Sequence, residues 1–226
     1  MQLIQEMKLN RKILLTLYKR LYQAYGPQNW WPADTPFEIM VGAILTQNTA
    51  WTNVEKAIQN LKQADALNLS SLLNKKENEL AELIRPSGYF NVKTRRLKHF
   101  AEWFLRHDKY IGLDKLETNN LRKQLLSVNG IGPETADDIL LYAFQRPVFV
   151  IDAYTRRLLL ALDLIKGDEN YETLRQGFES SLKPDVPQFQ EYHALIVRHA
   201  KQKCLKTKSC MHCQIIQSLP EKLTES

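Results

Sequence analysis

The sequence contains little cysteine and no long apolar run. Its 226 residues include three cysteines, all near the C-terminal end: Cys204, Cys210 and Cys213. An odd number of cysteines confined to one end argues against a disulfide framework and favours a reducing compartment. The absence of about 18 consecutive apolar residues excludes a membrane span, and residues 1–6 lack the pattern of a signal peptide. We therefore expect a cytoplasmic protein with no membrane partner.

Sequence typical of β-strands is also scarce, because the one β-leaning run, Pro147 to Ile151, is short. Elsewhere apolar residues recur at helical spacing, which predicts an all-α protein. The stretch from Phe37 to Leu45 is apolar on nearly every side and predicts a central, buried helix. The predicted helices span residues 2–24, 37–45, 52–61, 67–83, 93–104, 136–143, 152–162, 171–182 and 189–203, with a loop at residues 85–89.

The net charge of +6 is a moderate lean toward polyanions and identifies no partner by itself. Two groups of basic residues are candidates for phosphate contacts. We expect such contacts from the C-terminal group, and we interpret the other group as a solvated helix face. The C-terminal group comprises Arg198, Lys201, Lys203, Lys206 and Lys208, and the other comprises Lys93, Arg95, Arg96 and Lys98.

The segment Gly130-Ile131-Gly132-Pro133-Glu134-Thr135 is the most informative part of the chain. Two glycines around one apolar residue predict a hairpin too tight for side chains, and Pro133 and Glu134 suit the first turn of a helix. Exposed amides in such a turn form a cradle for phosphate. Seventeen residues separate Glu134 from Asp152, a carboxylate preceded by apolar residues. This order indicates chemistry on a nucleic acid, although a plain helix corner and a helix N-cap at Asp152 remain alternatives.

With Gln47-Asn48-Thr49, Arg85-Pro86-Ser87-Gly88-Tyr89 and the cysteines after His199, these motifs resemble the helix-hairpin-helix DNA glycosylases of the endonuclease III superfamily, from about Trp31 to Cys213. The resemblance implies an all-α, two-lobed fold with an active-site cleft between the lobes. We expect one lobe at residues 28–146 and the other at 1–27 together with 147–226. It also implies a monomeric, nucleoid-associated enzyme that acts on double-stranded DNA containing a damaged base.

The resemblance also implies roles for individual residues. Asp152 would be catalytic, stabilising the positive charge that develops on deoxyribose as the N-glycosidic bond breaks. Gln47 would fill the gap left by a flipped nucleotide, the alternative being a helix C-cap. The residues expected to contact the DNA backbone are Gly130, Ile131, Gly132, Glu134, Thr135 and Lys201.

One departure from endonuclease III bears on the reaction. Glu134 stands where that enzyme has a lysine that attacks the sugar and cuts the strand, and a carboxylate cannot form an imine. This favours a monofunctional glycosylase. An adenine-mismatch glycosylase is disfavoured because Ala43 stands at the position of its second glutamate.

The 3-methyladenine glycosylase branch fits best, through Trp30-Trp31-Pro32, Trp51 and Glu134. The three tryptophans are the candidate pocket for a cationic alkylated purine, with core packing as the alternative. Two other functions remain open. One is an oxidised-pyrimidine glycosylase with or without AP lyase activity, and the other is a non-catalytic module that binds damaged DNA.

The cysteines are a reduced version of a family motif. Many relatives hold a [4Fe–4S] cluster with Cys-x6-Cys-x2-Cys-x5-Cys, whereas this chain has Cys204-x5-Cys210-x2-Cys213 and Leu219 in place of the fourth ligand. Four thiolates are the usual requirement for such a cluster. We therefore expect no cofactor, and a degenerate iron–sulfur site on the three cysteines remains the alternative.

Overall fold

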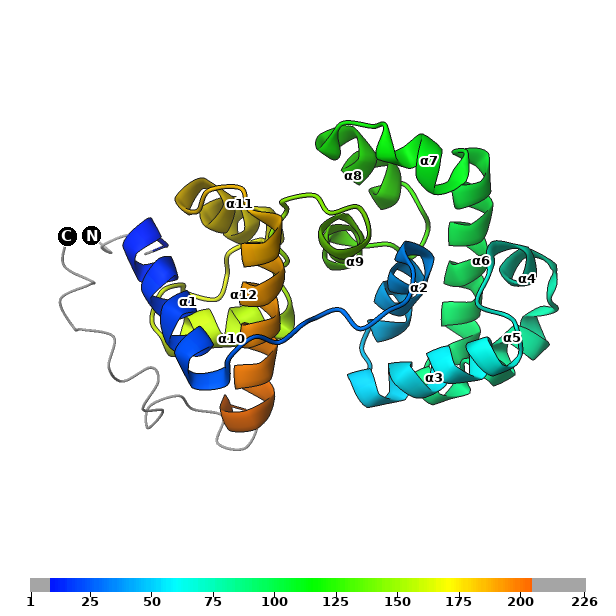
Figure 1. Cartoon of the computed structure of the whole chain (residues 1–226), viewed down its shortest axis with the longest axis horizontal. Helices are drawn as coiled ribbons and strands as arrows, with labels where there is room; N and C mark the ends of the chain where they lie inside the picture. The colour runs from blue at the N-terminus through cyan, green and yellow to red at the C-terminus, as the bar shows by residue number, and fades with distance from the viewer. Residues whose placement is uncertain (1–8, 205–226) are drawn as a thin grey trace. The chain divides into compact units, whose positions relative to one another are not determined.

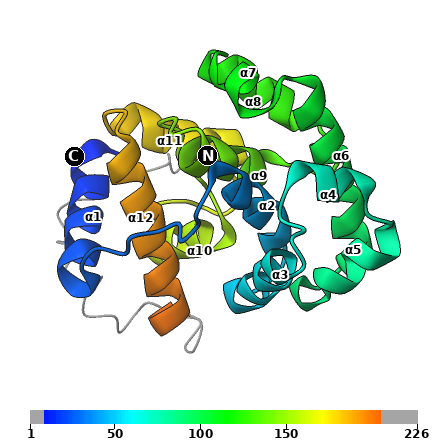
Figure 2. The same cartoon turned by 45° about the vertical axis from the view of Figure 1, so that its right-hand side comes forward.

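The structure is a computed structural model that describes residues 9–204, with side chains up to Gln202. The described residues form helices and contain no strand, which confirms the all-α prediction (Figures 1 and 2). The α-helices are α1 (Arg11–Tyr25), α2 (Pro36–Thr46), α3 (Trp51–Gln63), α4 (Leu69–Asn74), α5 (Glu77–Leu83), α6 (Phe90–Arg106), α7 (Lys109–Asp114), α8 (Thr118–Leu126), α9 (Pro133–Asp138), α10 (Ala153–Ala161), α11 (Tyr171–Ser181) and α12 (Val186–His199). A 3₁₀-helix, η1 (Arg85–Ser87), and two π-helices, η2 (Ile139–Ala143) and η3 (Ala200–Cys204), complete the described elements.

The chain divides into two compact units. The middle unit is Trp31–Arg146, and the terminal unit combines Met1–Trp30 with Pro147–Ser226. No helix among residues 9–204 has both the length and the apolar character needed to cross a membrane.

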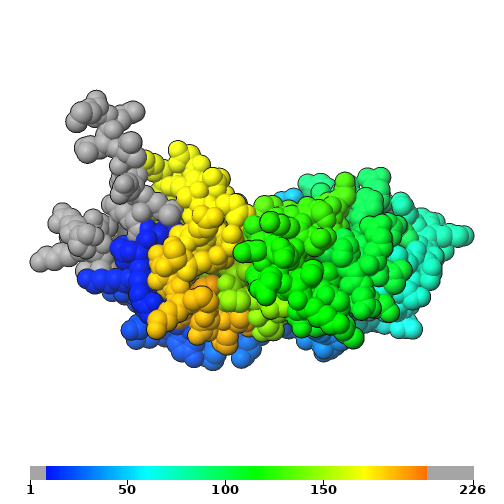
Figure 3. Space-filling model, turned by 90° about the horizontal axis from the view of Figure 1, so that it is seen from above, coloured from blue at the N-terminus to red at the C-terminus, as the bar shows by residue number. Residues whose placement is uncertain are grey.

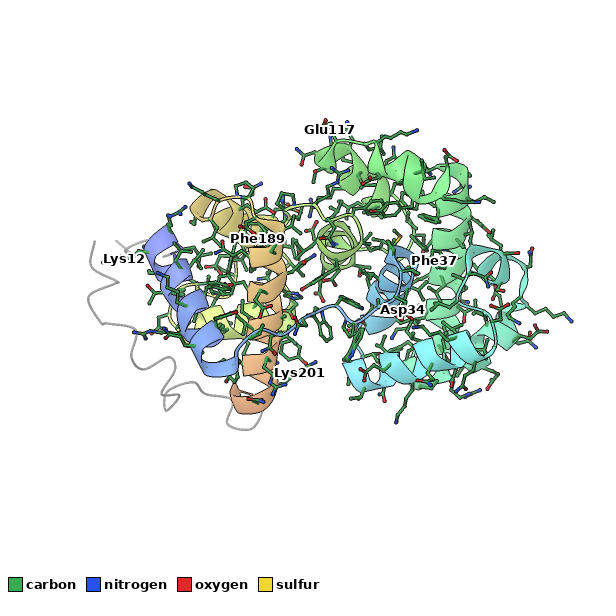
Figure 4. All side chains as sticks on the ribbon, viewed as in Figure 1. Lys12, Asp34, Phe37, Glu117, Phe189 and Lys201 are labelled. Carbon is green, nitrogen blue, oxygen red and sulfur yellow. The ribbon has the colours of Figure 1, made fainter. Side chains whose placement is uncertain are left out.

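Helix α2 forms the centre of the middle unit, as the sequence predicts. Thr35 caps its start by accepting a hydrogen bond from the Glu38 N–H at 3.1 Å, and Pro36 occupies the first turn. The helix contacts α3, α6, α9 and η2, and each fully buried aliphatic side chain contributes about 1.5–3 kcal/mol. Phe37 lies between α2 and α6 (Figure 4), with its ring centroid 5.7 Å from that of Phe104.

The predicted helix over residues 67–83 is wrong as one element, because the structure has α4 and α5 with a break between them. Asn68 caps α4, and Lys75 and Lys76 are extended. Lys98 of α6 explains the break: its ammonium donates to the carbonyls of Leu72, Leu73 and Lys75 at 2.8–3.2 Å. These bonds satisfy the open C-terminal end of α4.

Other boundaries also differ from the prediction. The loop at residues 85–89 contains the short helix η1, and α7 and α8 were not predicted. Both helices lie in the green segment that forms one face of the middle unit in Figure 3. Helix α8 buries Leu121 and Leu125, one turn apart, which is enough for a short amphipathic helix.

The terminal unit has an aromatic core. Phe149 stacks on Phe178 with ring centroids 4.0 Å apart, and Phe189 (Figure 4) meets Phe149 edge-on at 5.4 Å. The Tyr192 hydroxyl donates to the Leu14 carbonyl at 3.0 Å and so ties α12 to α1. The β-leaning run before Asp152 is buried but forms no strand, because no described strand lies beside it.

Helix α1 starts later than the predicted residue 2. In the described part of the chain, Asn10 is its N-cap, and the Asn10 side chain accepts from the Ile13 N–H at 3.0 Å. Asparagine is a favoured N-cap residue, so this polar side chain stands directly before the apolar face of α1, which buries Ile13, Leu14, Leu17 and Leu21. Residues 2–8 of the prediction lie outside the described range.

Candidate active site

The predicted Gly-x-Gly hairpin lies in the middle unit, where it joins α9 to α8, a helix that was not predicted. Arg122 of α8 donates to both carboxylate oxygens of Asp137 on α9, at 2.6 and 3.0 Å, and Asp137 is fully buried. A bidentate arginine–carboxylate pair fixes geometry as well as adding energy. The pair therefore holds the two helices of the motif in one arrangement.

The two glycines of the hairpin have different roles. Gly130 has φ +92°, and a Cβ there would collide with Cγ and Cδ of Arg96. Gly132 has φ −92° and open space around the position of a Cβ. The prediction of a turn too tight for any side chain therefore holds at Gly130 and is wrong at Gly132. Gly132 is the N-cap of α9 and is exposed, as are Pro133 and Glu134.

Gln47 ends α2 as its C-cap residue and contacts the hairpin directly. Its Nε2 donates to the Gly130 carbonyl and to the Thr135 hydroxyl, both at 2.9 Å. Its Oε1 accepts from the Arg96 guanidinium. All these residues belong to the middle unit, so one side chain links the end of α2, the basic helix α6 and the hairpin.

Lys93 lies one turn before Arg96 on α6 and is 1% exposed. Its ammonium donates to the Leu45 carbonyl (2.8 Å), the Thr49 hydroxyl (2.7 Å) and the Ser87 carbonyl (2.6 Å). Burial, with a smaller effect of Arg96, lowers the pKa of Lys93 to about 8. The interpretation of residues 93–98 as a solvated face is therefore wrong for Lys93, Arg96 and Lys98, which bind groups inside the unit.

Two of the three predicted pocket tryptophans meet in the middle unit. Trp31 and Trp51 are edge-to-face with ring centroids 5.0 Å apart, and Tyr142 of η2 lies 5.3 Å from Trp31. A pocket of about 410 Å³ borders both tryptophans. Its lining consists of Trp31, Pro32, Glu38, Gly42, Trp51, Glu55, Ile58, Gln59 and Lys62.

One side of this pocket carries carboxylates paired with Lys62. Glu38 is 5% exposed, accepts from the Asp34 N–H at 3.1 Å and pairs with Lys62 at 2.8 Å. Asp34, two residues before α2 (Figure 4), pairs with the same ammonium at 2.6 Å. The pocket thus combines aromatic rings with a carboxylate–lysine cluster, and the rings are the part that attracts a cation. Trp30 belongs to the terminal unit and does not line this pocket.

Asp152 caps α10 in the terminal unit and is 8% exposed. Its Oδ1 accepts from the Thr155 N–H at 2.7 Å, and its Oδ2 lies 3.6 Å from Nε2 of His193 on α12. Burial raises the pKa of Asp152, but the His193 imidazole and the Thr155 N–H outweigh burial, so the pKa lies below its ordinary value. The N-cap alternative is confirmed, and the cap keeps a buried carboxylate oriented and ionised.

Lys201 also lies in the terminal unit, in η3, and is exposed (Figure 4). Its ammonium is 6.0 Å from the ring of Tyr154, the second residue of α10. The basic side chains of Lys203, Lys206 and Lys208 lie outside the described side chains.

The cysteine set does not fit a four-thiolate cluster, because the chain has three cysteines. Cys210, Cys213 and the side chain of Cys204 lie outside the described part of the structure. Among the described residues, no group of three or more His, Cys, Asp or Glu side chains is arranged to hold a metal ion. The expectation of no cofactor stays a prediction.

The sequence did not predict the roles of His193, Lys93 and Arg96. His193 is one of several polar residues on a mostly apolar helix, and no local pattern pairs it with Asp152. Lys93 and Arg96 read as an ordinary basic helix face. The three-residue spacing of Lys93 and Arg96 places them on one face of α6, but only tertiary contacts show that this face is buried.

An all-α chain with a glycine hairpin between two packed helices, and with a capped, ionised carboxylate on a later helix, defines the class of helix-hairpin-helix DNA repair enzymes. The family described as HhH-GPD superfamily base excision DNA repair protein matches residues 41–184. The chain belongs to this family and is a DNA glycosylase.

Individual relatives agree with this assignment. A Methanocaldococcus jannaschii protein that bears the provisional name of a DNA repair glycosylase is 47% identical over 214 residues, covering 92% of this chain and 97% of its own. The crystal structure of Helicobacter pylori 3-methyladenine DNA glycosylase bound to 1,N6-ethenoadenine is 32% identical, covers 85% of this chain and 97% of that one, and gives a TM-score of 0.72. An endonuclease III–DNA complex gives a TM-score of 0.77 at 17% identity, covers 92% of this chain and 94% of that one, and shows the common fold.

Proposed function

We propose that this enzyme is a monofunctional glycosylase that hydrolyses the N-glycosidic bond of an alkylated purine, such as 3-methyladenine, in double-stranded DNA. The observation that carries the substrate class is the 410 Å³ pocket bordered by Trp31 and Trp51 with carboxylates beside them. A purine alkylated on a ring nitrogen is cationic, and aromatic faces attract a cation by about 0.5–2 kcal/mol. The similarity to the Helicobacter pylori enzyme supports the same class of base.

Asp152 supplies the charge that the reaction needs. Breaking the N-glycosidic bond leaves positive charge on deoxyribose, and an ionised carboxylate stabilises that charge. The Thr155 N–H and His193 keep Asp152 ionised although it is buried. An alkylated purine is a good leaving group, so Asp152 together with a stacking pocket suffices for hydrolysis.

Glu134 supports the monofunctional assignment. It is exposed in the first turn of α9, at the hairpin position where the resemblance to endonuclease III would place a lysine. A glutamate forms no Schiff base with the sugar. The exposed backbone of the hairpin would hold DNA phosphate, with Lys201 as a further cation.

A base-release assay tests this proposal. Duplexes containing 3-methyladenine, 7-methylguanine or thymine glycol are incubated with enzyme, and released base is measured with and without borohydride. We expect release of the methylated purines and no covalent adduct. Release of thymine glycol with borohydride trapping would assign the oxidised-pyrimidine reaction, which the endonuclease III relatives make the second candidate. Tight binding of damaged DNA without release of any base would instead assign the protein as a non-catalytic module that binds damaged DNA.

A further inference from the structure

We propose that Arg96 is a positioning residue that joins the hairpin to the loop bearing Gln47, so that gripping the DNA backbone and filling the vacated base position act as one unit. The proposal rests on the proposed function, because it gives Gln47 and the hairpin their roles on DNA. Its structural part concerns the free enzyme and can be tested without DNA.

The first observation is the contact of Arg96 with the hairpin. Its aliphatic stem covers Gly130 so closely that a Cβ there would meet three consecutive atoms of the Arg96 side chain. Gly130 also has the left-handed φ that favours glycine. The hairpin thus has both a backbone and a steric reason to keep glycine at this position, and the steric one is Arg96.

The second observation is the set of bonds around the Gln47 amide. Arg96 donates to its oxygen, and its nitrogen donates to the Gly130 carbonyl and the Thr135 hydroxyl. Oxygen and both N–H groups are therefore used, which leaves the amide a single orientation. A side chain already fixed loses less rotamer freedom when it enters a vacant base position.

The third observation is that the loop after Gln47 is held by the same helix. Lys93, one turn from Arg96, binds the Leu45 carbonyl and the Thr49 hydroxyl on the two sides of Gln47. Trp51 begins α3 two residues after Thr49. The buried face of α6 therefore sets the loop that carries both the proposed plug and a wall of the proposed base pocket.

A double-mutant cycle in the free enzyme tests the contact itself. Arg96→Gln, Gln47→Ala and the double variant are unfolded in urea, and the midpoints are compared. We expect the double variant to be no less stable than the weaker single variant, since each removes the same network. If the stability losses of the two single variants add up in the double variant, Arg96 and Gln47 are not coupled and the proposal fails.

Binding experiments test the role on DNA. The probes are an undamaged duplex and the same duplex with a tetrahydrofuran abasic site, which presents the vacancy that Gln47 would fill. We expect Arg96→Gln to lose about tenfold in affinity for the abasic duplex and little for the undamaged one. Gln47→Ala should do the same, and the double variant should lose no more.

Arg95→Gln is the matched control, because Arg95 is an exposed arginine on the same helix, next to Arg96. It should change both affinities equally and slightly. If Arg96→Gln lowers both affinities equally and reduces the salt slope by about one, then Arg96 is a phosphate contact and the proposal fails. Arg96→Met, which keeps the aliphatic stem over Gly130 and removes the donor to Gln47, covers the case in which Arg96→Gln does not fold. It should show the same selective loss, and unaltered abasic binding by a folded Arg96→Met would overturn the proposal.

Failure of the proposed function has a different signature. A wild-type enzyme that neither prefers the abasic duplex nor releases a base would refute the function, while the urea cycle would still show coupling between Arg96 and Gln47. A wild-type enzyme that prefers the abasic duplex, combined with additive unfolding data, would refute the positioning role alone.

Discussion

Asp152 is an Asp at a position where Asn would fold equally well. Its Oδ1 accepts from the Thr155 N–H at 2.7 Å, and asparagine is as good an N-cap as aspartate. We therefore expect Asp152→Asn to keep the melting temperature and duplex affinity nearly unchanged while base release falls by at least a hundredfold, or about 2.7 kcal/mol. Asp185→Asn is the matched control, because Asp185 caps α12 in the same way but is exposed. Near wild-type release by Asp152→Asn would remove the carboxylate from its proposed role.

His193 faces Asp152 from α12 and favours its ionised form. Without it, burial would raise the pKa of the carboxyl, so the enzyme would lose its active, ionised form at a higher pH. We expect His193→Gln to shift the acidic limb of the pH–rate profile upward. His199→Gln, on the same helix, loses the 2.9 Å bond to the Tyr25 hydroxyl and should leave that limb in place. An unchanged limb in His193→Gln would show that the pair does not set the titration of Asp152.

Substitutions of Trp51 distinguish a role in the base pocket from a role in core packing. It is partly exposed and borders the 410 Å³ pocket, so we expect Trp51→Ala to slow excision of a cationic alkylpurine about tenfold. Affinity for undamaged DNA should hardly change, because phosphate contacts dominate it. Trp51→Phe should recover most activity. Trp103, which is 4% exposed in α6, is the packing control: Trp103→Ala should lower the melting temperature. A Trp51→Ala variant that loses stability, DNA affinity and activity together would favour the packing alternative.

At the scale of elements, helix α6 supports two loops through one buried lysine, Lys93, and one half-buried lysine, Lys98. Lys93 binds three oxygens at the Gln47 loop and η1, and Lys98 binds three carbonyls at α4. Removing either lysine leaves oxygens without their donor, at about 1–3 kcal/mol for each buried group. We expect Lys93→Met to lower both stability and excision, and Lys98→Met to lower stability while excision persists. Equal effects of the two variants on excision would show that Lys93 does not position the loop.

The lowered pKa of Lys93 also predicts a pH dependence. The folded state releases the proton near pH 8 and the unfolded state near 10.5, so between these values the unfolded chain binds more protons and stability rises with pH from this group. Urea unfolding at pH 7.5 and 9.5 should therefore show the wild type gaining stability relative to Lys93→Met at the higher pH. A constant difference between the two proteins would show that Lys93 titrates normally.

Helices with a continuous apolar pattern were predictable, and so were capped starts such as Asp152. Helix α2 followed from its apolar surface and Asp152 from its spacing after the hairpin. The break between α4 and α5 was not predictable, because a lysine from a distant helix stabilises it. The same holds for His193 beside Asp152 and for Gln47 against Gly130, which are far apart in the chain. A local sequence pattern indicates the backbone preference of a segment and which of its faces is buried. These contacts depend instead on which helices pack together.

At the scale of the whole molecule, each unit has its own core and its own set of candidate residues. The middle unit is one continuous segment with the hairpin, Gln47, Trp31 and Trp51, while the terminal unit is assembled from both ends of the chain and carries Asp152. The chain therefore crosses between the units at Trp30–Trp31 and again at Arg146–Pro147. Asp152 follows the second crossing within a few residues. It therefore caps α10, the first helix after the chain re-enters the terminal unit.

The cysteines of the terminal unit give a prediction for the whole purified protein. A [4Fe–4S] cluster normally needs four thiolates, and this chain has three cysteines, with Leu219 at the position of the fourth. We expect protein purified without oxygen to contain well under one [4Fe–4S] cluster, or about four irons, per chain, and to keep its base-release activity after treatment with a chelator. The measurements are iron and acid-labile sulfide per chain, with Leu219→Cys as the matched variant that restores the fourth thiol at its family spacing. Iron that rises in Leu219→Cys would identify the missing thiolate as the defect. A wild-type protein with about four irons per chain, lost in Cys210→Ser, would contradict the prediction and require a ligand other than cysteine.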